Sequence, residues 1–165
     1  MQDKLVSIIM NCHNGEKFLS QAINSVLKQS YKNWELIFWD NCSTDNSSII
    51  LKSFNDSRIK YFKSTVFSSL GEARQAAFEK CLGEYIAFLD TDDWWDQNKL
   101  KQQVHFFKKN KNVKILYTNC FIYYQKTKKK KLLPTRLYSG MIAKELLKNY
   151  FINILTVMMK RDIFK

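Results

Sequence analysis

The stretch Tyr85-Ile-Ala-Phe-Leu-Asp90-Thr-Asp92-Asp93-Trp94-Trp95 joins an apolar run to three carboxylates that lie within four residues. The apolar part has the composition of a buried strand, and the carboxylates follow where such a strand would reach the surface. Repulsion and loss of hydration oppose this crowding of like charges unless a cation or another partner compensates them. The stretch therefore predicts a divalent-metal site at the end of a strand.

Before this stretch, short apolar runs predict three strands, and apolar residues at helical spacing predict a helix after each strand. The predicted strands cover residues 5–10, 34–39 and 58–62, and the predicted helices begin at caps at Asn14, at Ser43 to Asp45 and at Ser69. Ser69 and Glu72 have the spacing of a capping box. The first two helices are expected to run to about residues 29 and 54, and Gly83 is the expected end of the third.

After the acidic stretch, the sequence predicts one further helix capped by Asp96 and running to about Lys109. The remaining predicted elements are strands at 113–119, 121–124 and 154–159 and an amphipathic helix from Ser139 to about Phe151. Alternating strands and helices favour a mostly parallel α/β sheet that is flanked by helices on both faces.

Polar side chains follow three of the predicted strands. Asn11 follows the first, Asp40 and Asn41 follow the second, and the acidic stretch follows the fourth. Each of these residue types is also an ordinary turn former. However, parallel sheets bind ligands beyond the carboxyl ends of their strands, so the convergence on one edge favours a binding site.

The chemistry of this edge suits a phosphorylated ligand. Carboxylates are ligands for Mg²⁺ or Mn²⁺, which often bind together with substrate phosphates. Asp40 is available to receive the N–H of a base or a ribose hydroxyl. Arg74, near the start of its helix, could meet a phosphate with a fork of donors. The alternative for Arg74 is a surface ion pair with a neighbouring glutamate.

Composition indicates one soluble globular domain in the cytoplasm. The chain has 165 residues, of which 45% are hydrophobic and 25% charged, and no apolar run approaches the roughly 20 residues of a membrane-spanning helix. Asp3 and Lys4 interrupt the region where a signal peptide would be apolar. The four cysteines are widely spaced, which favours reduced thiols, and two histidines are too few for a multi-histidine metal site.

Positive charge is concentrated in the second part of the chain. Residues 1–96 contain 13 acidic and 10 basic side chains, whereas residues 97–165 contain 2 acidic and 17 basic ones. Such a field favours an anionic partner, either a phosphate-bearing substrate, an acidic membrane surface or a nucleic acid. The run from Lys126 to Lys131 is either an exposed hairpin loop or part of an anion-binding surface.

Five motifs occur in order within about residues 5–105. They are Val6-Ser-Ile-Ile-Met-Asn-Cys-His-Asn14-Gly15, Ala22-Ile-Asn-Ser-Val-Leu-Lys-Gln29-Ser-Tyr31, Trp39-Asp-Asn-Cys-Ser-Thr-Asp45, Gly71-Glu-Ala-Arg74 and Gly83-Glu-Tyr-Ile-Ala-Phe-Leu-Asp90-Thr-Asp-Asp93. This set resembles the family 2 glycosyltransferases of the GT-A fold, a Rossmann-like α/β fold. The resemblance implies a nucleotide-diphospho-sugar donor, usually linked to UDP, a divalent metal such as Mn²⁺ or Mg²⁺, and inversion at the anomeric carbon by direct displacement.

The resemblance also assigns roles to the strand-end residues. Asp40 and Asn41 would hold the base with Asn11 beside them, Arg74 would bind the donor, Asp92 would contact the ribose or the metal, Asp93 would be the first metal ligand, and Asp90 would complete the acidic motif. The implied acceptor is a glycan or a lipid-linked molecule at the inner face of the cell membrane. Peripheral contact with acidic lipids would fit the basic second part.

Three departures from the family pattern are visible. Asn41 stands where many members have a second aspartate, and Gln75 stands where many have asparagine. The family places its catalytic base, an Asp or Glu, downstream of the metal motif, where this chain has only Glu145 and Asp162 after Asp96. Asp162 is a weak candidate. The expectation is a single domain, 1–165, truncated at its C-terminus, with a nucleotide-binding half at 1–110 and the start of an acceptor-side half at 111–165.

Two functions follow, and a third ranks last. The first is a metal-assisted transferase, and the second is a nucleotide-sugar-binding fragment that cannot turn over because its base is missing. A nucleic-acid-binding protein is placed last, because the sequence has no zinc-finger, RNA-recognition or helix-turn-helix signature. A nucleotidyltransferase is disfavoured by the lack of a glycine-rich phosphate loop near the first strand.

Overall fold

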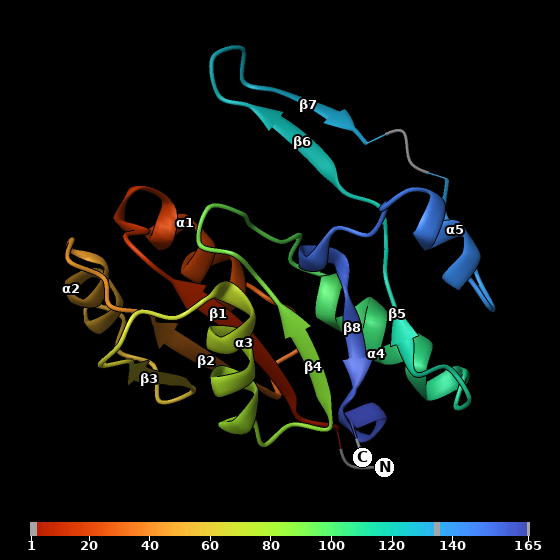
Figure 1. The fold of residues 1–165 in the computed structure, drawn as a ribbon, viewed down its shortest axis with the longest axis horizontal. Helices are drawn as coiled ribbons and strands as arrows, with labels where there is room; N and C mark the ends of the chain where they lie inside the picture. The colour runs from red at the N-terminus through yellow and green to blue at the C-terminus, as the bar shows by residue number, and fades with distance from the viewer. Residues whose placement is uncertain (1–2, 134–135, 165) are drawn as a thin grey trace.

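The computed structural model describes residues 3–133 and 136–164. Its strands are β1 (Val6–Cys12), β2 (Trp34–Asp40), β3 (Ile59–Lys63), β4 (Tyr85–Phe88), β5 (Ile115–Leu116), β6 (Phe121–Tyr124), β7 (Lys129–Leu132) and β8 (Met158–Lys160). Within the described residues they form a six-stranded sheet of order β3-β2-β1-β4-β8-β5 and a separate β6-β7 hairpin (Figure 1).

The sheet is mostly parallel, as predicted. β1 pairs in parallel with β2 and β4, and β2 pairs in parallel with β3. Among the described strands of this sheet, β8 alone runs antiparallel to the others, between β4 and β5. Because successive strands leave β1 first on one side and then on the other, the order reverses between β1 and β4, and ligands bind parallel sheets at such a switch point.

Helices cover both faces of the sheet. The helices are α1 (Glu16–Leu27), α2 (Ser47–Lys52), α3 (Leu70–Glu79), α4 (Lys99–Lys109) and α5 (Ala143–Lys148), with short 3₁₀ turns η1 (Ile154–Thr156) and η2 (Arg161–Phe164). Side chains of α1, α2 and α4 share one core cluster with Ile8 and Met10 of β1, whereas α3 packs in a second cluster around Ile9. Alternate residues of β1 thus point into different cores, so this strand is buried on both faces.

Some predicted boundaries are wrong in the first half. Asn14 does not begin α1, because its backbone is left-handed (φ 55°) and Gly15 occupies the cap position. The predicted capping box at Ser69 and Glu72 is confirmed. Gly83 does not end α3, which stops at Glu79; a Cβ at Gly83 would lie 2.6 Å from the Ser7 backbone nitrogen, so close approach of two backbones explains the glycine.

The second half contains shorter elements than its apolar pattern predicts. The strand expected at 113–119 is limited to Ile115–Leu116, and the one expected at 154–159 is η1 followed by β8. The helix expected at 139–151 is only Ala143–Lys148 and buries no residue. An apolar stripe stabilises a helix when it packs against a core, and here no core covers it. No helix in the described parts of the chain combines the length and apolar character that crossing a bilayer requires.

A buried carboxylate ties β1 and β2 to the segment before β4. Glu35 is 3% exposed, and its Oε1 accepts from the Ser7 hydroxyl at 2.5 Å and from the Leu82 backbone N–H at 2.7 Å. The Lys60 ammonium donates to Oε2 at 2.6 Å. Burial raises the pKa of Glu35, but these donors lower it more, so the pKa lies below its usual value.

We expect Glu35→Gln to lower the free energy of unfolding by about 2–3 kcal/mol at pH 7, because charge-assisted hydrogen bonds are lost in a buried place. The folded-state pKa lies below the unfolded value of 4.5, so the carboxylate contributes its full stability above that pH and loses it as the pH falls through the folded-state value. Urea unfolding at pH 7 and pH 3 should show a smaller difference between the two proteins at pH 3.

The matched control is Glu79→Gln, which removes an exposed carboxylate at the end of α3. Its effect should stay within about 0.5 kcal/mol at both pH values. An equal effect of Glu35→Gln at pH 7 and pH 3 would contradict the assignment of the stability to its charge.

Candidate functional site

The turns that follow β1 and β2 are joined by hydrogen bonds that cross from one turn to the other. Asn14 Oδ1 accepts from the Thr44 backbone N–H at 2.8 Å, and Asp45 Oδ2 accepts from the Glu16 backbone N–H at 2.9 Å. Glu16 Oε2 in turn accepts from the Asn46 backbone N–H at 2.9 Å. The carboxyl ends of these two strands therefore form one hydrogen-bonded unit beside the switch point.

Asp40 lies at the predicted edge, but its side chain is fully buried. Its Oδ1 accepts from the Ser43 backbone N–H at 2.7 Å, and its Oδ2 accepts from the Tyr61 hydroxyl at 2.8 Å. Burial and this hydrogen bond raise the pKa of Tyr61 to about 12. The side chain thus holds the turn after β2 and Tyr61 in place, and its contact with a ligand stays a prediction.

Asn41 is also buried, and it fixes the segment before α3. Its Nδ2 donates to the Ser68 carbonyl at 2.8 Å, and its Oδ1 accepts from the Ser68 hydroxyl at 3.1 Å. The His13 ring lies over Phe67 with centroids 4.7 Å apart. These contacts draw the 64–69 segment toward the end of β1.

A pocket of about 150 Å³ lies between these two segments. Its lining residues are Asn11, Cys12, His13, Asn41, Phe67, Ser68, Leu70 and Ala73. Sites for drug-sized ligands occupy about 300–1,000 Å³, so this pocket suits one planar ring. The Asn11 Nδ2 is buried without a hydrogen-bond partner in the described residues. Such a donor needs an acceptor, and a ring carbonyl in the pocket would supply one.

Arg74 points at the acidic stretch. Its Nη2 lies 3.1 Å from Asp90 Oδ1, and both side chains are partly exposed. The partner is therefore an aspartate of the acidic motif, whereas the sequence alternative named a neighbouring glutamate. A guanidinium has five N–H donors, so one bond to Asp90 leaves others for an anion above the sheet edge.

Asp92 and Asp93 carry the uncompensated charge of the site. A turn is closed by the Asp93 backbone N–H, which donates to the Asp90 carbonyl at 3.2 Å. Within the described residues, neither carboxylate forms a hydrogen bond or an ion pair. Burial, followed by the charges of Asp92 and Asp90, raises the pKa of Asp93 to about 6. The repulsion inferred from the sequence is thus present in the fold.

A divalent cation fits this pair when a substrate completes its coordination. Among residues 3–133 and 136–164, no three His, Cys, Asp or Glu side chains come together in a group that could hold a metal. Mg²⁺ commonly takes one or two carboxylates and fills its remaining positions with water and phosphate oxygens. The uncompensated Asp92 and Asp93 match that donor set.

Gly15 brings the turn after β1 against the acidic stretch. A Cβ at this position would lie 2.8 Å from Thr91 Oγ1 and 3.0 Å from Cys12 Sγ. Thr91 lies between Asp90 and Asp92, so any side chain at position 15 would push on the acidic residues. The absence of a side chain at Gly15 therefore allows the turn after β1, beside the small pocket, to lie close against the acidic stretch.

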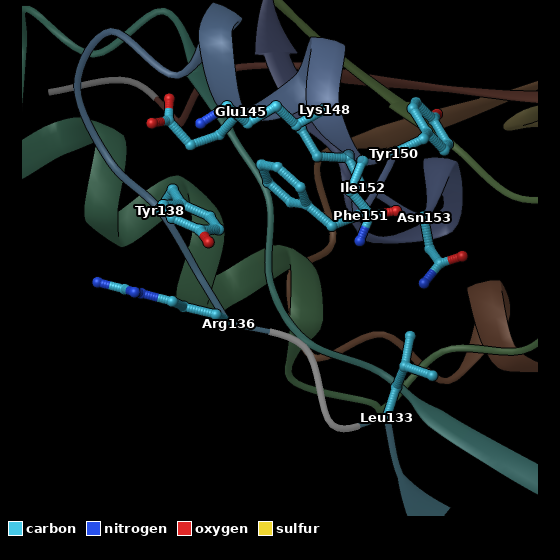
Figure 2. Close-up of a pocket in the computed structure, with 10 residues that line it drawn as sticks. Leu133, Arg136, Tyr138, Glu145, Lys148, Tyr150, Phe151, Ile152 and Asn153 are labelled. Atoms are coloured by element: carbon cyan, nitrogen blue, oxygen red, sulfur yellow. The ribbon is translucent and has the colours of Figure 1, made fainter.

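A larger cavity of about 640 Å³ lies around α5 in the second half of the chain (Figure 2). Its lining residues are Leu133, Arg136, Tyr138, Glu145, Lys148, Asn149, Tyr150, Phe151, Ile152 and Asn153. The Tyr138 and Phe151 rings form one wall with centroids 5.0 Å apart, and the Arg136 guanidinium lies 5.0 Å from the Tyr138 ring.

This cavity reaches Cys120, which directly precedes β6. Asn153, which lines the cavity, donates to Cys120 Sγ at 3.4 Å. Burial raises the pKa of Cys120, the Asn153 hydrogen bond lowers it, and the nearby charge of Asp93 raises it. Sequence reasoning did not identify the cavity, because its walls come from irregular segments with no motif.

The two downstream carboxylates lie in different places. Glu145 lines the larger cavity. Asp162 contacts Lys114 just after β8, whose Lys160 pairs with Tyr85 at the start of β4. About five residues of extended chain, roughly 17 Å, separate that end of β4 from Asp90. The pairing of β8 with β4 thus places Asp162 toward the other end of β4 from the acidic stretch, and its role as a base stays a prediction.

Comparison with known proteins identifies the family. A model described as Glycosyl transferase family 2 matches residues 7–165. The chain is 39% identical over 163 residues to WfgD of Escherichia coli, a UDP-Glc:alpha-D-GlcNAc-diphosphoundecaprenol beta-1,3-glucosyltransferase. That match covers 99% of this chain and 63% of WfgD. E. coli WfaP, a protein of the same description, is 39% identical over 119 residues, which is 72% of this chain and 47% of WfaP. The chain thus spans less than two thirds of these relatives.

Solved structures confirm the predicted GT-A fold. S. aureus TarS 1-349 in complex with UDP-GlcNAc superposes with a TM-score of 0.74 at 20% identity, over 94% of this chain and 45% of TarS. The mannosyltransferase PcManGT from Pyrobaculum calidifontis, in complex with GDP-Man and Mn²⁺, gives a TM-score of 0.74 at 14% identity, over 99% and 46%.

We expect Asp93→Asn to stabilise the chain in the presence of a chelator, because it removes a desolvated charge that Asp90 and Asp92 repel. The expected gain in free energy of unfolding is about 1 kcal/mol at pH 8 and low salt, measured by urea unfolding. Asp162→Asn, which neutralises a carboxylate paired with Lys114, is the control and should give no gain. A loss of stability in Asp93→Asn would contradict the repulsion.

Proposed function

The chain belongs to glycosyl transferase family 2, and from this premise we propose that it binds a UDP-sugar and supports transfer of the sugar to a lipid-linked diphosphate acceptor. The observation that carries the proposal is the uncompensated Asp92 and Asp93 pair beside Arg74 at the carboxyl edge of the sheet. The donor and acceptor classes are suggested by the description of WfgD, which is similar over 99% of this chain.

The base of the nucleotide would occupy the small pocket at the end of β1. Asn11 Nδ2, a buried donor without a partner in the described residues, would donate to a carbonyl oxygen of the base. Asn41 would shape the pocket by holding Ser68, and Asp40 would hold the turn after β2 through the Ser43 backbone N–H. In this assignment Asp40 is a positioning residue, which differs from the base contact that the family resemblance implies.

The diphosphate would lie over the acidic stretch. Asp93 and Asp92 would hold Mn²⁺ or Mg²⁺, which when bound would neutralise the charge of the departing diphosphate. Arg74 would direct its remaining N–H donors at a phosphate oxygen while Asp90 holds the guanidinium in place. Inversion by direct displacement would require the acceptor hydroxyl on the side opposite the diphosphate.

The acceptor would approach from the second half of the chain. The larger cavity reaches Cys120 through Asn153, the charge of Asp93 acts on the Cys120 thiol, and the cavity combines an aromatic wall with Arg136 and Lys148. Aromatic faces suit sugar rings, and the cations suit phosphates. An acceptor anchored by a lipid would be used at a membrane surface, on the cytoplasmic side in this proposal.

A second candidate is a donor-binding fragment without turnover. In the described residues, the carboxylates after Asp96 are Glu145 in the larger cavity and Asp162 beyond the far end of β4. Direct displacement needs a base near the acceptor hydroxyl. Because the chain covers only 63% of WfgD, a base from a longer chain would be needed in this alternative.

We expect UDP-glucose with Mn²⁺ to raise the melting temperature by several degrees, since a ligand at about 100 times its Kd stabilises by about 2.7 kcal/mol. Asp93→Asn should remove most of this shift, and Asp162→Asn should keep it. Differential scanning fluorimetry with a panel of nucleotide sugars and EDTA controls would measure the effect. A panel without any shift would overturn the donor proposal.

Turnover distinguishes the two candidates. The transferase predicts release of UDP that depends on a synthetic N-acetylglucosamine-diphospho-alkyl acceptor. The binding fragment predicts the melting shift without UDP release, and release restored in a longer chain.

Arg74→Lys should weaken donor binding by about tenfold, because an ammonium cannot keep both the Asp90 contact and a forked phosphate contact.

A further inference from the structure

The β6-β7 hairpin carries the densest positive charge in the chain. Lys126 and Lys128 to Lys131 place five lysines within six residues. No acidic residue occurs between Asp96 and Glu145, and no ion pair within the described residues includes a hairpin lysine. The hairpin projects away from the six-stranded sheet (Figure 1). Its charge is therefore open to solvent and uncompensated.

Strand register separates the two faces of the hairpin. Tyr123 pairs with Lys130, and the Tyr123 ring meets the edge of Trp94 with centroids 5.2 Å apart, so this face turns toward the acidic stretch. Paired residues of an antiparallel ladder share a face, and neighbours along the strand point to the other one. The opposite face, here called the outer face, therefore carries Ile122, Tyr124, Lys129 and Lys131.

The outer face combines exposed apolar groups with the lysines. Ile122 is 41% exposed and Tyr124 is 46% exposed. A lysine-rich face that only kept the protein soluble would gain nothing from apolar side chains beside the charges. Tyrosine and aliphatic groups next to lysines suit the boundary between lipid headgroups and acyl chains, where each polar end stays hydrated.

We propose that the outer face docks on a bilayer surface that contains anionic phospholipids. The lysines would lie at the headgroup phosphates, while Ile122 and Tyr124 enter the interfacial layer. The Tyr123 contact with Trp94 would then hold the acidic stretch close to that surface. This inference goes beyond the proposed sugar transfer, and it needs neither donor nor acceptor to be tested.

A nucleic acid is a weaker match to the same surface. Its phosphates would attract the lysines, but it offers little to the exposed isoleucine of the outer face, Ile122. Apolar aliphatic groups gain when they leave water for lipid. The combination of lysines with aliphatic side chains therefore favours the bilayer.

Cosedimentation of the whole chain with phosphatidylcholine vesicles, with and without 30% phosphatidylglycerol, tests the proposal. We expect binding that requires phosphatidylglycerol and weakens in 0.5 M salt. Neutralising two lysines, Lys129→Gln with Lys131→Gln, should weaken binding roughly 25-fold, since each lysine near an anionic surface contributes about fivefold. Lys101→Gln with Lys109→Gln on α4 removes the same charge from exposed positions away from the hairpin and should change binding less than about twofold.

A second variant tests the apolar part of the outer face. Ile122→Ser with Tyr124→Ser should reduce the binding that remains in 0.5 M salt, while melting temperatures show that every variant stays folded. Three results would overturn the proposal. They are no binding to the anionic vesicles, equal losses in the hairpin and α4 variants, and a hairpin variant that loses binding to a single-stranded oligonucleotide but keeps binding to vesicles.

Discussion

Parallel pairing of β1 with both β2 and β4 is the constraint on which the rest of the structure depends. β1 is buried on both faces and lies between two cores. Its parallel pairing places the carboxyl ends of β2 and β4 at the same edge of the sheet as its own. The turns after these strands must meet there, because parallel strands point the same way. Asn11, the Asn41 turn and the Asp90 to Asp93 turn are therefore brought together by backbone hydrogen bonds, whatever ligand the edge receives.

Some carboxylates of this region hold the fold together through hydrogen bonds, and others have no hydrogen-bond or ion-pair partner among the described residues. Asp40 and Glu35 are sealed and fully hydrogen-bonded, and each holds a neighbouring segment in place. Asp92 and Asp93 have no such partners among the described residues, and the raised pKa of Asp93 records their repulsion. Carboxylates thus have different roles here, and the difference is whether hydrogen-bond donors of the protein surround them.

The second half contrasts with the compact sheet. Its helix α5 buries no residue, its hairpin stands away from the core, and its acidic groups are few. It is linked to the acidic stretch by the Trp94 ring, which contacts Tyr123, and by the Trp95 indole N–H, which donates to the Leu155 carbonyl at 2.9 Å. A cavity with aromatic and cationic walls and a lysine-rich hairpin therefore lie on the side of the molecule where the acidic stretch ends.

The sequence by itself determined the α/β class, the order of the first elements, the capping box at Ser69 and the family, because these depend on local periodicity, caps and motif spacing. After residue 110 the strand predicted at 121–124 matches β6, but the predicted lengths of the other two strands and of the helix are too long, since an apolar pattern cannot tell whether a core exists to cover it. Only the tertiary structure decided that Asp40 is sealed, that Arg74 pairs with Asp90, that Asp162 lies beyond the far end of β4 and that Gly83 packs on Ser7. Each of these depends on contacts between residues distant in the chain, and a single sequence does not encode such contacts in any local pattern.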